Sequence, residues 1–468
     1  MTNYEDIRNN SLFGKALGNT LEIPEKWKIE FNLTPPSSVN TAFKLNVYKA
    51  VNIMIVCYFF LRLELINNLV PSIWSIFLLF ITLLSIHIIS CMTSSQIYFL
   101  VRKSVWIVIS LFILLGYKFF NYGNFRLDNM ILYLSISIPF LIIGYNHALK
   151  QKNLDKIVFP LIILYLLSYA PSIIPYLYSG EYSREALNLT IFKSQENAGL
   201  VHLWPFLASL ILISWGVFKT SRTQFLVRNG LFLSWAFLLI FIFFSGFMSG
   251  IFFLVTSVIF IYIFNLNITK FFKTSLIFIL FLFLLYYLLL TYASGPTLAK
   301  ISAINMFIQS GFLLNEEIIN IITSDRWFTT LHSINQFLEK PFFGHGIYLE
   351  SVSGMLGNVH DFDTAAGGHN FFIDLTAFMG IFSIPIILIY FNLIRQSRKI
   401  AKLTAGYNLY TLNLIIYSIF VSVFISNILN HWLLFSAFDN FIFLLAGYVY
   451  GQLYLNVKNK RTKQIKNR

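Results

Sequence analysis

The feature that most constrains this chain is a series of long apolar runs, many of about 20 residues, the length of a helix that crosses a bilayer. The runs are continuous and do not alternate with polar residues, which favours helices over strands. Only 12% of the 468 residues are charged, whereas soluble domains carry about 25%. The sequence therefore predicts an all-α polytopic membrane protein.

Hydropathy predicts about twelve spans, each of about 15–25 residues. Their approximate limits are 47–61, 72–91, 105–120, 130–146, 157–178, 198–218, 229–245, 250–267, 274–292, 370–394, 408–428 and 432–454. Residues 1–46 are polar and have no apolar run behind a basic start. We therefore expect this segment to stay in the cytoplasm without a cleavable signal peptide.

Basic residues mark every second connection between the predicted spans. They lie in 92–104, 147–156, 219–228, 268–273 and 395–407, and again in the tail 456–468. Because cytoplasmic connections collect Lys and Arg, this alternation predicts that both termini are cytoplasmic. It also accounts for the net charge of +14 without a nucleic-acid partner, and the tail could in addition contact anionic lipid headgroups.

One outer connection, residues 293–368, is far larger than an ordinary loop. It separates nine predicted spans in 47–292 from three in 369–455, and it holds seven acidic residues against three basic ones. Helical periodicity in the stretch from Asn315 to Lys340 is stopped by Pro341, so we expect short helices here. The apolar contacts expected of this stretch are Ile318, Ile322, Phe328, Ile334 and Phe337.

The predicted spans have almost no ionisable residues near their centres, and paired Gly- or Pro-broken spans are not evident. Both observations argue against an ion-coupled transporter. The chain also lacks a P-loop, a GxSxG elbow and a dinucleotide fingerprint in the right context. Any activated donor must then come from the lipid, and we expect chemistry at the outer membrane–water boundary.

Residues 365–380, AAGGHNFFIDLTAFMG, place His369 and Asn370 where a glycine-containing run meets an apolar helix. An imidazole that titrates near neutral pH can accept a proton from an attacking hydroxyl. The amides and dipole of a helix start suit an anion such as a diphosphate. The alternative is that one of these residues only caps the helix.

Two arginines of the outer connections are candidates for holding a diphosphate, because a guanidinium binds phosphate oxygens in a bidentate way. They are Arg326, in TSDRWFTTL, and Arg184, in EYSREALN. The alternative for each is an ion pair with a neighbouring acid. Glu196 and Asn197 open an apolar run, where they either cap a helix or bind sugar hydroxyls.

Two further outer histidines, His345 in GHG and His360 in NVHD, are candidates for sugar binding. With Asp361, Asp363 and His369 they could suggest a metal site. Their spacing matches no defined metal motif, so we expect neither a metal nor another cofactor.

Together these segments resemble the C-terminal pattern of the O-antigen polymerase/ligase family. That pattern combines an arginine, an amphipathic helix, a proline, a G-x-G turn, and a His-Asn pair opening a span that contains a glycine. SDRWFTTLHSINQFLEKPFFGHG and GHNFFIDLTAFMG supply them as Arg326, Pro341, Gly344, Gly346, His369, Asn370 and Gly380. SQENAGLVHLWPFL also resembles the family's upstream motif, without its proline. Two family features are absent: an arginine near SGFMSG, and a second histidine at Gly367.

The resemblance implies an inverting, metal-independent glycosyltransferase that uses an undecaprenyl-diphosphate-linked oligosaccharide. His369 would orient or deprotonate the acceptor hydroxyl, and Arg326 and Arg184 would stabilise the departing diphosphate. The other substrate-binding residues would be Glu196, Asn197, Asn370, His345 and His360.

Three functions remain open at this point. The first is a polymerase of O-antigen or capsular repeat units, which we favour in part because polymerases are the more divergent members of the family and this sequence is divergent. The second is a ligase that transfers glycan to lipid A core, or a related protein oligosaccharyltransferase, and the third is a polysaccharide flippase or other transporter. The expected location is the bacterial cytoplasmic (inner) membrane with the site facing outward. Membrane lipids, a chain-length regulator and flippase proteins are the candidate partners.

Overall fold

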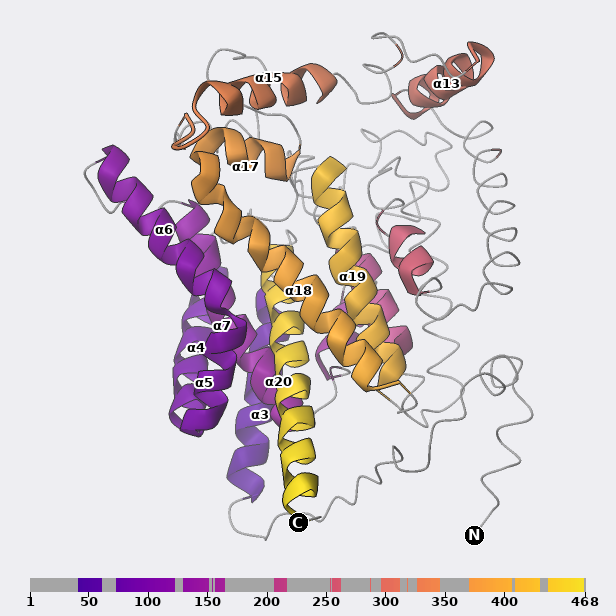
Figure 1. The fold of residues 1–468 in the computed structure, drawn as a ribbon. Coiled ribbons are helices and arrows are strands. Elements are labelled where there is room, and N and C mark those ends of the chain that lie inside the picture. Colours follow the sequence, from indigo (N-terminus) through magenta and orange to yellow (C-terminus); the bar gives the residue numbers. More distant parts are fainter. Residues whose placement is uncertain are drawn as a thin grey trace. The chain divides into compact units, whose positions relative to one another are not determined.

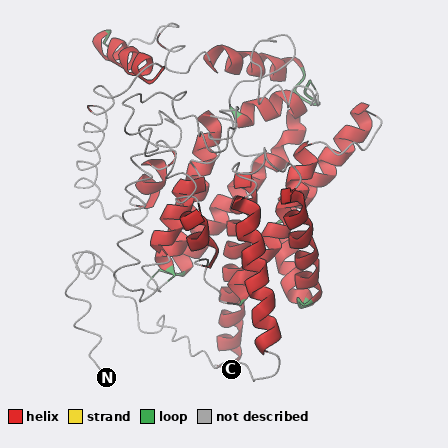
Figure 2. Cartoon of the chain, turned by 180° about the vertical axis from the view of Figure 1, so that it is seen from behind, coloured by secondary structure: helices red, strands yellow, loops and turns green. Residues whose placement is uncertain are grey.

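The structure is a computed structural model of the chain. It describes residues 41–60, 73–122, 129–150, 154, 156–164, 206–216, 253, 255–261, 287, 296–311, 318, 326–345, 370–405, 409–429 and 437–466. Contacts divide the chain into two units, Met1–Tyr48 and Lys49–Arg468. Every regular element in the described ranges is a helix (Figures 1 and 2), which confirms the all-α class.

The helices differ widely in length. They are α3 (Thr41–Phe60), α4 (Ile73–Ser90), α5 (Ser94–Lys103), α6 (Val105–Tyr122), α7 (Asn129–Leu149), α13 (Pro296–Gln309), α15 (Arg326–Glu339), α17 (Phe371–Met379), the 3₁₀ turn η3 (Gly380–Ser383), α18 (Ile384–Leu403), α19 (Tyr410–Leu429) and α20 (Ala437–Lys466).

Among the described residues, two helical runs are long and apolar enough to cross a membrane, Phe371–Leu403 and Tyr410–Ile428. A third is added if α5 and α6, which meet at 65°, form one broken span. Large apolar side chains on α4 and α6 are exposed, among them Leu79 and Phe112, as expected of surfaces that face lipid. These features support a membrane protein.

Several predicted spans are described only in part or not at all. The spans predicted at 157–178, 198–218 and 250–267 are represented by short helical stretches. The span at 229–245 lies outside the described residues, as does 274–292 apart from Tyr287.

Helix boundaries depart from the predicted spans where basic residues begin. Helix α5 lies within the predicted connection 92–104, α18 continues through much of 395–407, and α20 extends into the tail at 456–468. Lys and Arg are good helix formers, so a polar connection does not need to end a helix. The predicted span 370–394 is instead interrupted at Gly380, where α17 ends and η3 begins.

Helices α7 and α20 pack with their backbones in contact. A Cβ atom at Gly144 would overlap the carbonyl oxygen of Leu444, and one at Gly447 would overlap that of Leu141. Gly447 and Gly451 form a G-x-x-x-G pattern, which allows close helix approach in membranes. This pair is the tightest junction that the structure describes.

Buried hydrogen bonds fix α3 and α20 against α7. Ser137 Oγ donates to Asn440 Oδ1 at 3.0 Å, and Asn440 Nδ2 donates to the Tyr58 hydroxyl at 2.6 Å. The ring of His147 bonds Asn52 Oδ1 through Nε2 at 2.8 Å. Side-chain hydrogen bonds of this kind hold membrane helices in register where lipid offers no competing partner.

Candidate functional site

Helix α15 forms within the large connection and ends at Glu339, two residues before Pro341, which confirms the predicted stop. Proline disfavours the helical conformation of the residue before it. Among the residues of α15 whose side chains are described, 330–339, Ser333 is the buried one and has no exposed surface, while the predicted contacts Ile334 and Phe337 are only partly buried. A polar residue therefore lies at the centre of the face that packs.

Two contacts define how α15 and α17 pack. Ser333 Oγ donates to Asp374 Oδ1 at 2.8 Å, both residues being buried. Eight residues after Ser333, the carbonyl of Pro341 accepts a hydrogen bond at 3.0 Å from the backbone N–H of Ile381, which lies seven residues after Asp374. Later residues of one segment meet later residues of the other, so α15 and α17 run parallel, side by side (Figure 1).

The turn after α15 docks on the end of α17 through two glycines. Gly344 has φ 65° and Gly380 has φ 57°, a region that residues with a Cβ rarely adopt. A Cβ at Gly344 would overlap the Phe378 carbonyl, and one at Gly380 would approach the carbonyl of Pro341. The Pro-x-x-Gly part of the sequence pattern is thus the junction that joins the two helices.

The start of α17 is capped by Asn370. Its Oδ1 accepts a hydrogen bond from Ile373 N at 3.2 Å, and its backbone is extended. Asn370 therefore caps α17.

The remaining predicted site residues lie outside what the structure describes. Arg326 is the first residue of α15, but its side chain is not described. The residues outside the described ranges are His369, Arg184, Glu196, Asn197, His360 and Gly346.

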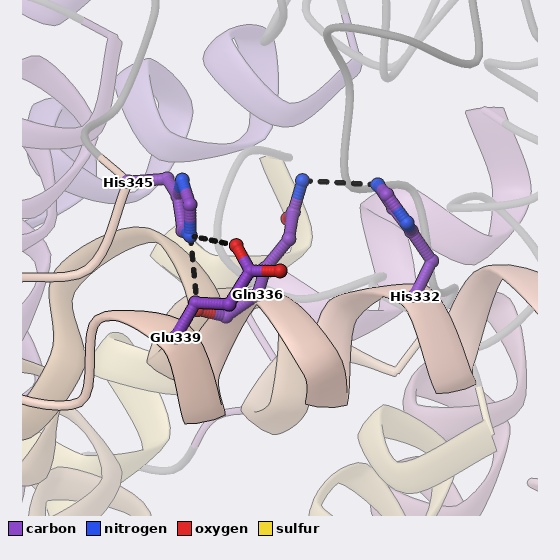
Figure 3. A network of polar contacts seen from close by, with 4 residues as sticks. All are labelled: His332, Gln336, Glu339 and His345. Carbon is purple, nitrogen blue, oxygen red and sulfur yellow. Dashed lines mark hydrogen bonds and ion pairs between the residues drawn. The ribbon is translucent and has the colours of Figure 1, made fainter.

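His345 fastens the turn to α15 (Figure 3). Its Nε2 donates to the Gln336 carbonyl at 3.0 Å and lies 3.5 Å from Glu339 Oε2. That carbonyl belongs to the last turn of α15 and also accepts a hydrogen bond from Lys340 N at 3.2 Å. Gln336 Nε2 also lies 3.0 Å from His332 Nε2. Sequence reasoning missed His332 and Gln336, whose i, i+4 spacing was the available signal.

The end of α19 adds buried polar groups close to the start of α17. The rings of Phe372 and Phe424 lie 4.9 Å apart, centroid to centroid, which places the two segments in contact. On α19, the side-chain polar atoms of Ser422, Ser426 and Asn427 are buried and have no hydrogen-bond partner among the residues described. Such groups need a polar partner, and the Ser-x-x-x-Ser-Asn spacing could have identified them.

The described part of the site is thus a junction of two parallel helices beside the polar end of a third. A helix start suits an anionic ligand through its backbone N–H groups, and adjacent hydroxyl and amide groups suit a polar one. In comparisons with known proteins, no family model matches the chain and no curated protein matches it significantly.

Proposed function

We propose that this protein is a polytopic inner-membrane glycosyltransferase that polymerises O-antigen or capsular repeat units carried on undecaprenyl diphosphate. The observation that carries the proposal is the parallel packing of α15 on α17, fixed by the Ser333–Asp374 hydrogen bond. This packing favours a short distance between Arg326 and His369. The roles that the family resemblance implies for these two residues require such a distance.

The helix geometry supports this proximity. Arg326 precedes Ser333 by seven residues, so it lies about 20° from the same face and about 10 Å earlier along α15. Asn370 precedes Asp374 by four residues, about 6 Å earlier along α17. The two helix starts then differ by about 4–5 Å along parallel axes, and the axes of packed helices lie about 8–10 Å apart, a separation that an arginine and a histidine side chain can span together.

The proposed topology has about twelve spans, cytoplasmic termini, and residues 293–368 outside. The alternation of basic connections supports it. In this orientation, the starts of α15 and α17 face the outer leaflet. A polyprenyl tail then stays in lipid while its diphosphate reaches the site.

In the proposed reaction, an acceptor sugar hydroxyl attacks the anomeric carbon of the lipid-linked glycan. His369 takes the hydroxyl proton, the new glycosidic C–O bond forms, and the anomeric C–O bond to the diphosphate breaks with inversion. Arg326 and Arg184 stabilise the charge on the departing diphosphate. Glu196, Asn197, Asn370, His360 and the polar end of α19 are candidates for binding sugar hydroxyls.

The test is replacement of His369 by alanine in the parent strain, with the surface polysaccharide separated on a gel. We expect the ladder of long chains to collapse to single-repeat material. His87→Ala is the control, because His87 is exposed on α4, outside the candidate site, and it should keep the ladder. A normal ladder from a stably expressed His369→Ala protein contradicts the catalytic role.

The same gel separates the alternatives. Loss of a ligase leaves no glycan on the lipid core while carrier-linked chains accumulate outside. Loss of a flippase leaves the carrier-linked repeat units on the cytoplasmic side. A paired Arg326→Ala and Lys340→Ala comparison then tests the diphosphate contact, since both residues are basic and lie within 293–368. Only Arg326→Ala is expected to reduce the ladder.

A further inference from the structure

Four basic residues gather where the end of α5 meets α18. Arg102 and Lys103 end α5, and Arg395 and Lys399 lie one turn apart on α18. Lys103 is partly buried, whereas the other three are exposed. Helices α5, α6 and α18 contain no acidic residue, so none of them supplies a counter-charge to this cluster, which we call the basic junction.

A network of uncharged polar groups holds the basic junction together. Lys103 Nζ donates to Gln396 Oε1 at 3.1 Å, and Gln396 Nε2 donates to Asn392 Oδ1 at 3.1 Å. Asn392 Nδ2 in turn donates to the Lys103 carbonyl at 2.8 Å and to the Tyr450 hydroxyl at 3.0 Å. Three helices, α5, α18 and α20, therefore fix the positions of the like charges.

The cost of gathering these charges shows at Lys103, which lies in the connection 92–104 outside the predicted spans. Burial, and then the positive charges of Lys399, Arg102 and Arg395, lower the pKa of this ammonium group. Like charges held close together disfavour their own ionised forms. A bound anion would remove this penalty.

The exposed stripe of α18 indicates how deep in the membrane the basic junction lies. Ile384 and Phe391 are each 50% exposed, and Arg395, Lys399 and Lys402 follow them on the same face. An exposed stripe that changes from apolar to basic marks the level at which hydrocarbon gives way to headgroups. The basic junction therefore lies in the plane of the lipid phosphates.

We infer that the basic junction binds the phosphate headgroup of an anionic phospholipid, whose acyl chains lie along the exposed Phe391–Ile384 stripe of α18. Arg102 and Lys103 contact the headgroup from one side and Arg395 and Lys399 from the other. A lipid is the occupant because its phosphate is the anion present at this depth, and because the apolar stripe continues directly from the charges. With the proposed orientation, this is the cytoplasmic leaflet; the inference itself does not depend on glycosyl transfer.

The experiment uses the purified full-length protein in detergent, with thermal unfolding measured after addition of phosphatidylglycerol, phosphatidylcholine or inorganic phosphate. We expect phosphatidylglycerol to raise the unfolding temperature more than phosphatidylcholine, and this gain to fall as NaCl rises. Arg395→Gln/Lys399→Gln should weaken phosphatidylglycerol binding at least about tenfold. Lys150→Gln/Lys152→Gln removes the same charge from the next basic connection and should bind as the wild type does.

Three results would overturn the inference. The first is equal stabilisation by phosphatidylglycerol and phosphatidylcholine, and the second is equal loss of binding in the two double variants. The third is full reproduction of the lipid effect by inorganic phosphate, which would assign the junction to a soluble anion. If the Arg395→Gln/Lys399→Gln variant does not fold, two measurements still test the inference. The variant Arg395→Lys/Lys399→Arg keeps the charge and should retain phosphatidylglycerol binding. High NaCl should abolish phosphatidylglycerol binding to the wild type.

Discussion

Two helix pairs in this molecule are joined by glycines in different ways. Helices α7 and α20 touch along their lengths, with Gly144, Gly447 and Gly451 in the interface of regular helices. Helices α15 and α17 are joined at one end by turn glycines with positive φ, and nearer their starts by the buried Ser333–Asp374 hydrogen bond. The first arrangement spreads packing energy over a whole interface, while the second sets the position of one helix start against another.

The comparison predicts that damage to α7–α20 unfolds the protein, whereas damage to α15–α17 displaces the candidate site and spares the rest.

The largest effect is expected from Gly447→Leu. Its side chain would overlap the backbone of Leu141, and such overpacking costs about 3 kcal/mol or more. We expect little folded protein, as measured by membrane expression and by unfolding in detergent. Gly116→Leu is the control, because a Cβ there meets nothing within 4 Å. Similar stability of the two variants would contradict the close contact of α7 and α20.

The next effect is expected from Gly344→Ala. A left-handed conformation costs about 1–2 kcal/mol for a residue with a Cβ, and overlap with the Phe378 carbonyl adds to this. We expect folded protein with a weakened polysaccharide ladder. Gly311→Ala is the matched control, since its φ is 73° but a Cβ there would meet no described atom within 4 Å. A difference between the two variants isolates the contact with α17.

A smaller effect is expected from Ser333→Ala. Removing the hydroxyl leaves Asp374 Oδ1 without its 2.8 Å donor, at a cost of about 1–3 kcal/mol. A double-mutant cycle with Asp374→Leu should give a coupling energy well above zero. Thr376→Val is the control, since the Thr376 hydroxyl donates to the carbonyl of Ile373 within its own helix. Additive effects of the Ser333 and Asp374 changes would show that the two residues do not stabilise each other.

The smallest effect is expected from His345→Gln. The bond from His345 to the Gln336 carbonyl is partly exposed, so its loss should cost about 0.5–1 kcal/mol. If His345 serves only to hold the turn, the ladder should persist with little change. Loss of the ladder together with unchanged stability would instead support the predicted sugar-binding role of His345.

Much of the helical framework could be predicted from the sequence. The predicted spans 72–91 and 105–120 match α4 and α6 to within two residues at each end, because a long apolar run leaves a membrane segment no other way to satisfy its backbone. The end of α15 before Pro341 was also predicted, because proline disfavours the helical conformation of the residue before it. The interruption at Gly380 was not predicted, because its positive φ is set by the turn that packs against it.

The candidate site was predictable only as a set of residue types. The sequence indicated an arginine, a turn and a His-Asn pair, and also contained Asp374 as an acid in an apolar helix. It did not indicate that Asp374 bonds Ser333, 41 positions away, or that the polar end of α19 lies beside α17. Local periodicity carries no information on which distant faces meet.

The sequence by itself determined that this chain forms apolar helices and where some of the described ones, such as α4 and α6, begin and end, since hydrophobicity and local hydrogen bonding act over a few residues. Only the tertiary structure decided that α15 lies parallel to α17, that α7 and α20 come into backbone contact, and that cations of α5 and α18 share one junction. Those pairings depend on shape and charge between segments far apart in the chain, which meet only when the whole unit packs.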